Sequence, residues 1–384
     1  MSIIRRIESF PLEMRMRMPF ITSKAAQNTA KTVLVRLETD YATGYGETAP
    51  RLHITGETPE TASLMINNII APIIVGRDVH DFGLIRNELE SRIVGNPSAK
   101  IGVDLALLDA LGKTDKIKLS ELIGGSLRDS ITNDAVISAI DDRETVKWAE
   151  NYVKQGFKRI KVKVGGNRED PDTDIRKIKF LRESLGEDIK IKIDVNGAWS
   201  RVKAKYALRK LEKYNIEVAE QPVPYWDLEG LYEVKNSTSI PIMADESVFN
   251  SIDAARVLSS KGVDYINIKL IKTGTIKEAI KIAQFARLND VGVQIGSTME
   301  GSLISSAKVH FASTLENLCF SEIIGPQWIQ EEPFKGLEYD GPSVRVPRGY
   351  GLGIKVDEEH LKDYVMDIQN QNRSAKVTRM PVGQ

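Results

Sequence analysis

Lysine and carboxylate residues recur along the second half of the chain at spacings that could bring them into one site. Each follows a short apolar run, and the runs come about 25–30 residues apart, close to the length of one strand-plus-helix unit. The residues are Lys163, Asp194, Glu220, Asp245 and Lys269. One charged group for each unit would place all five side by side at one rim of a parallel sheet.

Three neighbouring carboxylates repel each other unless a cation lies between them. Their oxygen ligands favour Mg²⁺ or Mn²⁺ over Zn²⁺, with waters and substrate oxygens completing an octahedron. Lys161 and Lys163 would flank this ion on one side and Lys269 on the other. A lysine that is partly desolvated and close to other cations has a lowered pKa and can act as a base. The pattern therefore predicts proton transfer to and from a metal-held substrate.

Ordinary structural roles could explain each of these residues alone. An aspartate after a strand is most often a helix cap, and a lysine on a strand is usually solvated. Glu300 could simply lie in the first turn of a helix, where the helix dipole favours a carboxylate. The recurrence of such residues in consecutive units argues against chance for the set.

The elements that would position these residues are short apolar runs alternating with amphipathic helical segments. We expect strands near residues 134–140, 159–164, 190–195, 217–220, 241–244, 265–269, 291–295 and 318–323. Eight such units predict a (β/α)₈-type barrel, whose chemistry lies at the carboxyl ends of the strands. An open doubly wound sheet is the alternative, but no G-x-G-x-x-G motif follows the first strand.

The second of these strands, in the stretch "FKRIKVKVGG", has an unusual face. Period two sends Ile160, Val162 and Val164 to one side and both Lys161 and Lys163 to the other. A surface strand would explain this pattern, and so would a functional barrel interior. The neighbouring carboxylates favour the interior.

The first third of the chain differs from the rest in its predicted order of strands and helices. Residues 1–50 predict strands, with the glycines of "ATGYGE" indicating a hairpin turn, and residues 59–124 predict helices. We therefore expect an α+β capping domain over residues 1–125 and a barrel over residues 126–354. The tail, about residues 355–384, would pack back on the capping domain.

Composition narrows the class of protein. The chain has 384 residues, of which 41% are hydrophobic and 28% charged, and 53 basic residues balance 53 acidic ones. This balance gives no support for binding nucleic acid or an anionic membrane. The single cysteine, Cys319, excludes an intrachain disulfide and a cysteine-based metal site. With no signal peptide and no long apolar run, we expect a cytoplasmic protein.

The set "KVK … DVN … AEQP … ADES … NIKLIKTG" resembles the muconate lactonizing enzyme subgroup of the enolase superfamily. The N-terminal "PF", "GYGE" and "ITGET" are similar to that family's capping domain, and the resemblance spans about residues 1–355. It implies removal of a proton α to a carboxylate, or the reverse, through a metal-stabilised enolate. It also implies a homo-oligomer and a small carboxylate substrate.

The resemblance assigns roles to individual residues. The metal ligands would be Asp194, Glu220 and Asp245. Lys163 matches the base on one face of the substrate, Lys161 the lysine beside it, and Lys269 the lysine on the opposite face. Asn196 and Glu246 would orient the ligands or Lys269.

The choice of substrate depends on residues around this centre. The strand-eight end "SEIIGP" has Glu322 and Ile324 where dipeptide epimerases carry an Asp-x-Asp, and it is nearer to muconate cycloisomerases. The capping loop is polar at Thr22, Ser23 and Lys24, and Arg51 could bind a second carboxylate. The remaining candidate substrate contacts are His53, Thr298, Glu300 and Glu322.

The leading interpretation is thus a muconate-like cycloisomerase. Racemisation or epimerisation of an amino-acid derivative or dipeptide follows closely, because both lysines are present. A dehydratase similar to o-succinylbenzoate synthase comes third. A non-catalytic metal-binding scaffold is the alternative from another class, and the lysine pair argues against it.

Overall fold

The computed structural model describes residues 1–22, 26–138, 140–166 and 170–366. Ser23 and Lys24 of the predicted capping loop lie outside the described residues, as does the tail from residue 367. Within the described ranges, no helix combines the length and the apolar character that crossing a membrane requires.

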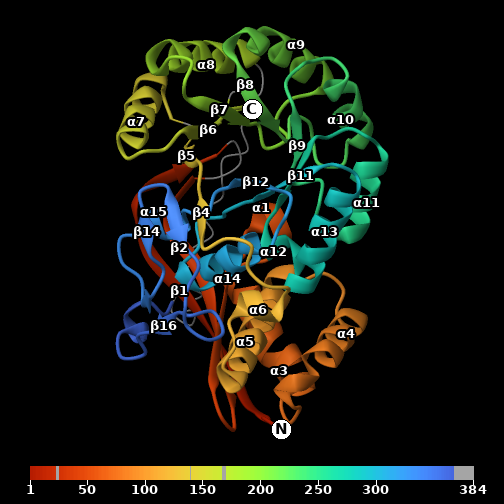
Figure 1. Ribbon diagram of the computed structural model, residues 1–384, viewed down its shortest axis with the longest axis vertical. Helices are drawn as coiled ribbons and strands as arrows, with labels where there is room; N and C mark the ends of the chain where they lie inside the picture. Colours follow the sequence, from red (N-terminus) through yellow and green to blue (C-terminus); the bar gives the residue numbers. More distant parts are fainter. Residues whose placement is uncertain (23–25, 139, 167–169, 367–384) are drawn as a thin grey trace, which may run out of the picture.

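The N-terminal part pairs a three-stranded antiparallel sheet with a layer of helices. The sheet consists of β1 (Ile4–Ile21), β2 (Ala26–Thr39) and β3 (Thr43–Thr48), in that order. Its helices are α1 (Leu52–Thr55), α2 (Pro59–Met65), α3 (Ala71–Ile74), α4 (Phe82–Arg92), α5 (Pro97–Asp115) and α6 (Leu119–Leu122). This part forms the lower half of the molecule in Figure 1.

The glycines of "ATGYGE" have a different role from the predicted one. Gly44 and Gly46 lie inside β3, not in a turn. A Cβ at Gly44 would lie 2.2 Å from the Ala106 carbonyl oxygen of α5, and one at Gly46 would lie 2.0 Å from that of Gly102. The two glycines are therefore needed because the backbones of β3 and α5 approach closely.

The second part is a curled sheet of eight parallel strands surrounded by helices. The strands are β5 (Ala135–Ile137), β6 (Arg159–Lys163), β7 (Lys190–Asp194), β8 (Ile216–Glu220), β9 (Ile242–Ala244), β10 (Tyr265–Ile268), β11 (Gly292–Ile295) and β12 (Leu318–Ser321), in sequential order. The helices are α7 (Asp142–Lys154), α8 (Pro171–Leu185), α9 (Arg201–Leu211), α10 (Leu228–Lys235), α11 (Ser251–Ser259), α12 (Leu270–Thr273), α13 (Ile276–Leu288), α14 (Ser302–Ser313) and α15 (Gly325–Trp328). They enclose the strands in Figure 1. The predicted barrel architecture is confirmed.

The first and last strands of the curled sheet meet. The amide N–H of Asp134, just before β5, donates to the Ser321 carbonyl oxygen at the end of β12 over 2.7 Å. Along β6 the side chains alternate as predicted. Ile160 and Val162 belong to the hydrophobic core, whereas Lys161 reaches carboxylates inside the barrel. Both faces of a parallel sheet that is covered by helices are buried. Lys161 and Lys163 are therefore shielded from water.

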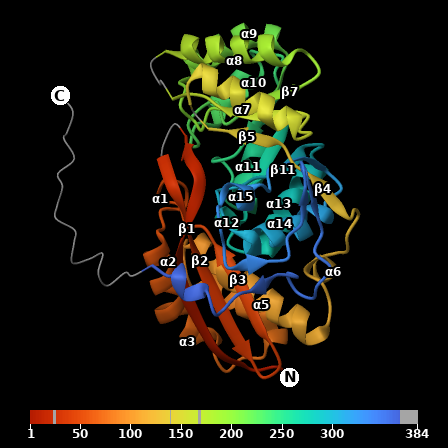
Figure 2. The same ribbon diagram turned by 90° about the vertical axis from the view of Figure 1, so that its left-hand side faces the viewer.

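The two parts touch along the barrel mouth. The β1–β2 hairpin reaches up to the barrel, as Figure 2 shows, and the Ile21 N–H at its tip donates to Ser138 Oγ after β5 over 2.9 Å. The last described residues return to the sheet, where the Met366 N–H donates to the Pro11 carbonyl oxygen. Short strands complete the fold: β4 (Ser130–Thr132), β13 (Phe334–Lys335), β14 (Tyr339–Asp340), β15 (Ser343–Arg345) and β16 (Lys355–Val356).

Candidate active site

Three carboxylates meet at the barrel mouth. Asp194 ends β7, Glu220 ends β8 and Asp245 directly follows β9, so three consecutive strands each contribute one. One oxygen from each lies within 4.8 Å of the others, and all three residues are completely buried. Such a set of hard oxygen donors suits a divalent cation.

The electrostatics of the triad fit that cation. Burial and the neighbouring charge of Asp194 raise the pKa of Glu220 to about 7. Burial also opposes the ionisation of Asp194, but the ammonium groups of Lys163, Lys161 and Lys269 lower its pKa to about 2. The protein's own lysines thus stabilise only part of the negative charge. A divalent cation would allow all three carboxylates to ionise together, so the residues present fit a metal ion.

Two lysines approach the triad from opposite sides of the barrel. Lys163 at the end of β6 forms an ion pair with Asp194, and Lys269 after β10 donates to Asp245 Oδ2 over 2.5 Å. Both lysines line the same narrow pocket of about 40 Å³ under the β1–β2 hairpin. The two strands are separated by β7, β8 and β9, which carry the triad, so the ammonium groups face each other across it.

Lys161 lies deeper than the other two lysines. It contacts Glu220 over 3.0 Å and Asp194 over 3.4 Å, and it also pairs with Glu322. It is 2% exposed and is not part of the pocket wall. The predicted lowering of the lysine pKa is not found at Lys269: burial opposes its charged form, but the carboxylates of Asp245 and Glu220 raise its pKa.

Most of the other predicted site residues surround the pocket. Asn196 Nδ2 donates to Glu246 Oε1 over 3.1 Å, and Lys163 donates to Asn196 Oδ1 over 3.2 Å. These contacts tie Lys163 to the loops after β7 and β9. The wall of the pocket is formed by Phe20, Thr22, Gln27, Arg51, His53, Ile54, Lys163, Asn196, Glu246, Lys269, Ser297 and Thr298.

Arg51 lines the pocket but is already engaged. Its Nη1 donates to the carbonyl oxygens of Lys31 and Pro50, and its Nη2 donates to those of Thr298 and Met299, all within 2.9 Å. The guanidinium therefore fastens the loop after β11 to the capping part. This use competes with the predicted binding of a second substrate carboxylate.

The structure does not place Glu300 and Glu322 in the pocket wall. Glu300 is completely buried and accepts from Lys308 Nζ over 2.6 Å. Glu322 is 2% exposed and lies between Lys161 and Lys192. Both carboxylates were predicted as substrate contacts, but each is held beneath the surface by an ion pair with lysine.

Sequence reasoning missed three residues near the site. Lys272 pairs with Asp245 over 2.7 Å and is buried beside Lys269. Lys192, which is completely buried, contacts Asp134 and Glu322. Ser297 joins Thr298 in the pocket wall. Period two along β7 places Lys192 on the same face as Asp194, so that lysine at least could have been found.

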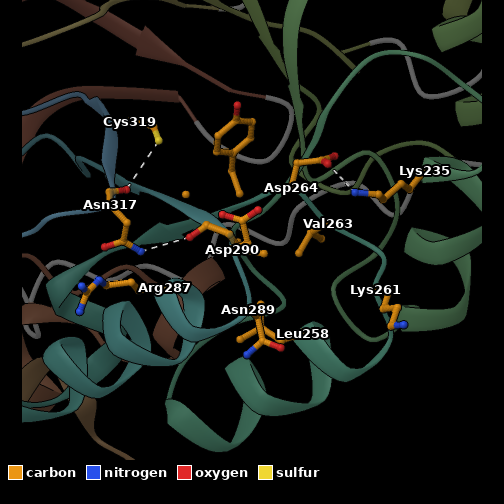
Figure 3. Close-up of a pocket in the computed structure, with 13 residues that line it drawn as sticks. Lys235, Leu258, Lys261, Val263, Asp264, Arg287, Asn289, Asp290, Asn317 and Cys319 are labelled. Atoms are coloured by element: carbon orange, nitrogen blue, oxygen red, sulfur yellow. Dashed lines mark hydrogen bonds and ion pairs between the residues drawn. The ribbon is translucent and has the colours of Figure 1, made fainter.

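A larger hollow, of about 690 Å³, lies elsewhere on the barrel. Its lining includes Lys235, Asp264, Arg287 and Cys319, which Figure 3 shows around it. Asp264 directly precedes β10, Val291 precedes β11 and Asn317 precedes β12. The hollow therefore opens at the amino ends of these strands. Barrel chemistry belongs to the opposite end, where the small pocket joins the lysines and the triad.

Comparison with known proteins agrees with this geometry. Residues 6–124 match the mandelate racemase / muconate lactonizing enzyme N-terminal domain, and residues 144–360 match the enolase C-terminal domain-like family. The chain belongs to the enolase superfamily. It resembles the subgroup that contains dipeptide epimerases and muconate cycloisomerases, as the sequence motifs predicted.

Individual members of the superfamily match over nearly the whole chain. The L-Ala-D/L-Glu epimerase of Bacillus subtilis is 36% identical over 355 residues, covering 91% of this chain and 96% of that protein. The Cytophaga hutchinsonii dipeptide epimerase, solved with Mg and the dipeptide D-Ala-L-Val, is 31% identical with a TM-score of 0.90, covering 94% of this chain and 98% of that one. The muconate lactonizing enzyme of Pseudomonas fluorescens, solved with muconolactone, is 28% identical with a TM-score of 0.92, covering 95% and 100%. The chain is an isomerase of the enolase superfamily, and its acidic triad fits a divalent metal.

Proposed function

We propose that this protein is a racemase or epimerase of an amino-acid derivative acylated on its amine. The observation that carries the proposal is the placement of Lys163 and Lys269 in one pocket wall, on opposite sides of the triad. Inverting a carbon centre requires a proton to leave one face and another to arrive at the opposite face. Two amines that face each other across the substrate supply both transfers.

In the proposed reaction, each residue around the pocket has a separate role. The substrate carboxylate points toward the triad, which brings the α-carbon between the two ammonium positions. Lys163 removes or returns the proton on one face and Lys269 on the other. Asn196 and Glu246 hold Lys163 and the loop beside it. We propose Mg²⁺, or Mn²⁺, as the ion of the triad; when bound, it supplies positive charge that stabilises the negative charge developing as the α-proton leaves.

The acylated amine follows from what the site offers around the α-carbon. A free substrate ammonium would need a carboxylate partner. At the end of β12, Glu322 is paired with two lysines and Ile324 is apolar and buried. In the pocket wall, Glu246 already accepts from Asn196. A second substrate carboxylate, as in muconate, would need a cation. Among the described residues, Arg51 has the suitable position but donates to four carbonyl oxygens.

Cycloisomerisation of an unsaturated diacid is the second candidate. The muconate lactonizing enzyme of P. fluorescens, solved with muconolactone, has the same fold with a TM-score of 0.92.

A substrate screen tests the proposal. The protein is incubated with Mg²⁺ and single enantiomers of N-acetyl and N-succinyl amino acids and of dipeptides, and the products are separated by chiral chromatography. Appearance of the other enantiomer or epimer is the expected result. Lactone formation from cis,cis-muconate, without inversion of any amino-acid derivative, would refute the racemase and establish the second candidate.

A further inference from the structure

The loop after β11, residues 296–301, contributes Ser297 and Thr298 to the pocket wall that also includes Lys269, and its own buried carboxylate, Glu300, contacts both hydroxyl groups. Glu300 accepts from Ser297 Oγ over 2.6 Å at one oxygen, and from both the N–H and Oγ1 of Thr298 over 2.6 Å at the other. Burial opposes its ionisation, but the Lys308 ammonium and the hydroxyl donors lower its pKa. Glu300 is therefore an acceptor for both hydroxyl groups of the loop.

The rest of the loop is fixed from several sides. Arg51 donates to the carbonyl oxygens of Thr298 and Met299, and Glu47 accepts from the Gly301 N–H over 2.9 Å. Met299 has a positive φ of 58°, a strained backbone conformation for a residue with a side chain. So many attachments to one short segment fix the direction in which its hydroxyl groups point.

The fixed hydroxyl groups have a defined polarity. A serine or threonine hydroxyl has one hydrogen and two lone pairs. Since Ser297 and Thr298 each give their hydrogen to Glu300, only lone pairs remain for a group in the pocket. This part of the wall can accept hydrogen bonds but cannot donate them.

We infer that Ser297 and Thr298 recognise an N–H group on the carbon that undergoes proton transfer, and that Glu300 is the positioning residue that makes them acceptors. The inference rests on the proposed function and specifies its substrate as a secondary amide. An amide nitrogen is one bond from the α-carbon, so it must lie beside one of the two lysines. Gly296 brings the loop there, because a Cβ at that position would lie 2.9 Å from Lys269 Cε.

An amide and its matching ester separate this inference from the proposed function. The two substrates are an N-acyl amino acid and the O-acyl 2-hydroxy acid with the same side chain, in which an oxygen replaces the N–H. The α-hydrogen of the ester is at least as acidic, so a slower reaction cannot come from the chemistry alone. The readout is the ratio of kcat/KM values for exchange of the α-hydrogen in D₂O with Mg²⁺.

The wild-type protein is expected to prefer the amide by about 10- to 100-fold, because the ester would place its own oxygen against the hydroxyl acceptors of the pocket wall. Ser297→Ala and Thr298→Val should each reduce this ratio about tenfold, and Ser306→Ala is the matched control. Ser306 lies in α14, outside the pocket, and donates to the Leu352 carbonyl oxygen. Thermal unfolding verifies that each variant is folded.

Two results would overturn the inference while the proposed function stands: equal exchange of amide and ester by the wild type, or a ratio that survives in both loop variants. Absence of exchange with either substrate would overturn the proposed function, and the inference with it. A preference for the amide that both variants lose and Ser306→Ala keeps supports the inference.

Discussion

The barrel interior holds two layers of charged residues built from the same residue types, all buried except Arg159 and Glu217, which are half-buried. The mouth layer consists of Lys163, Lys269 and the triad Asp194, Glu220 and Asp245. The inner layer lies toward the other end of the strands and consists of Asp134, Arg159, Lys192, Glu217 and Glu322. Lys192 contacts Asp134 over 2.8 Å and Glu322 over 3.2 Å, and Arg159 contacts Asp134 over 3.2 Å. Lys161 connects the layers, because it contacts Glu322 and Glu220.

The layers differ in what can reach them. In the mouth layer, both lysines line a pocket and the three carboxylates crowd within 4.8 Å. In the inner layer positive and negative groups alternate, and Lys192 is completely buried. In a network of alternating charges, each group has a partner of opposite sign. Like charges that cluster beside a pocket instead require a ligand of opposite charge. Access and charge pattern, more than residue type, separate a chemical site from a structural one.

Removing the metal, or one of its ligands, should affect the mouth layer most. We expect dialysis against EDTA to reduce isomerase activity at least 10³-fold, and added Mg²⁺ to restore it. Asp245→Asn should be inactive in the presence of Mg²⁺. Mg²⁺ should raise the Tm of the wild type, since it binds only the folded state, and should not raise that of the variant.

The control for this prediction is Asp290→Asn, in the hollow of Figure 3, which should keep both the activity and the Mg²⁺-dependent Tm. Full activity after exhaustive removal of divalent ions would show that the triad is a purely structural cluster like the inner layer.

Lys192→Met should destabilise the protein through the inner layer. It leaves Asp134 and Glu322 without their shared cation, which costs about 3–5 kcal/mol in the free energy of unfolding for a broken buried pair. Urea unfolding measures this cost. The folded variant should keep kcat/KM within about tenfold of wild type. The matched control, Lys190→Met, changes an exposed lysine on the same strand and should cost at most about 0.5 kcal/mol. A stable Lys192→Met variant without activity would show that Lys192 takes part in the reaction, as we propose for the residues of the mouth layer.

Glu47 tests a buried carboxylate that is held by backbone N–H groups, and its expected effect is a dependence of stability on pH. It is completely buried where β3 meets α14, and burial and the charge of Glu332 raise its pKa to about 8. The folded state therefore holds this proton more firmly than the unfolded state, in which the pKa is about 4.3. Its contribution to stability is present at low pH and is lost as pH rises toward 8.

Glu47→Gln should remove that dependence. The difference in unfolding free energy between wild type and variant should change by up to about 1.4 kcal/mol per pH unit between pH 5 and 8, to the disadvantage of wild type as pH rises. Urea unfolding at four pH values measures it. Parallel pH profiles of the two proteins would contradict the shifted pKa.

Much of this organisation could be predicted from the sequence, because it depends on period and spacing. Alternation in "RIKVKV" placed Lys161 and Lys163 inside the barrel, and regular spacing brought Asp194 into the triad. How deeply each side chain lies below the pocket surface could not be predicted in this way. Whether Glu300 or Arg51 faces substrate depends on partners far away in the sequence, such as Lys31 for Arg51. Gly44 was misread for the same reason, since its close neighbour Ala106 lies on a distant helix.

The most direct test of the two-lysine account follows α-hydrogen exchange by NMR in D₂O, starting from each enantiomer of an N-acyl amino acid. We predict that the wild type exchanges both enantiomers. Lys163→Ala and Lys269→Ala should each lose racemisation by about 10³-fold or more, and each should retain exchange of only one enantiomer, a different one in each variant. Exchange of both enantiomers by either variant, or of neither by the wild type, would contradict the assignment of one lysine to each face.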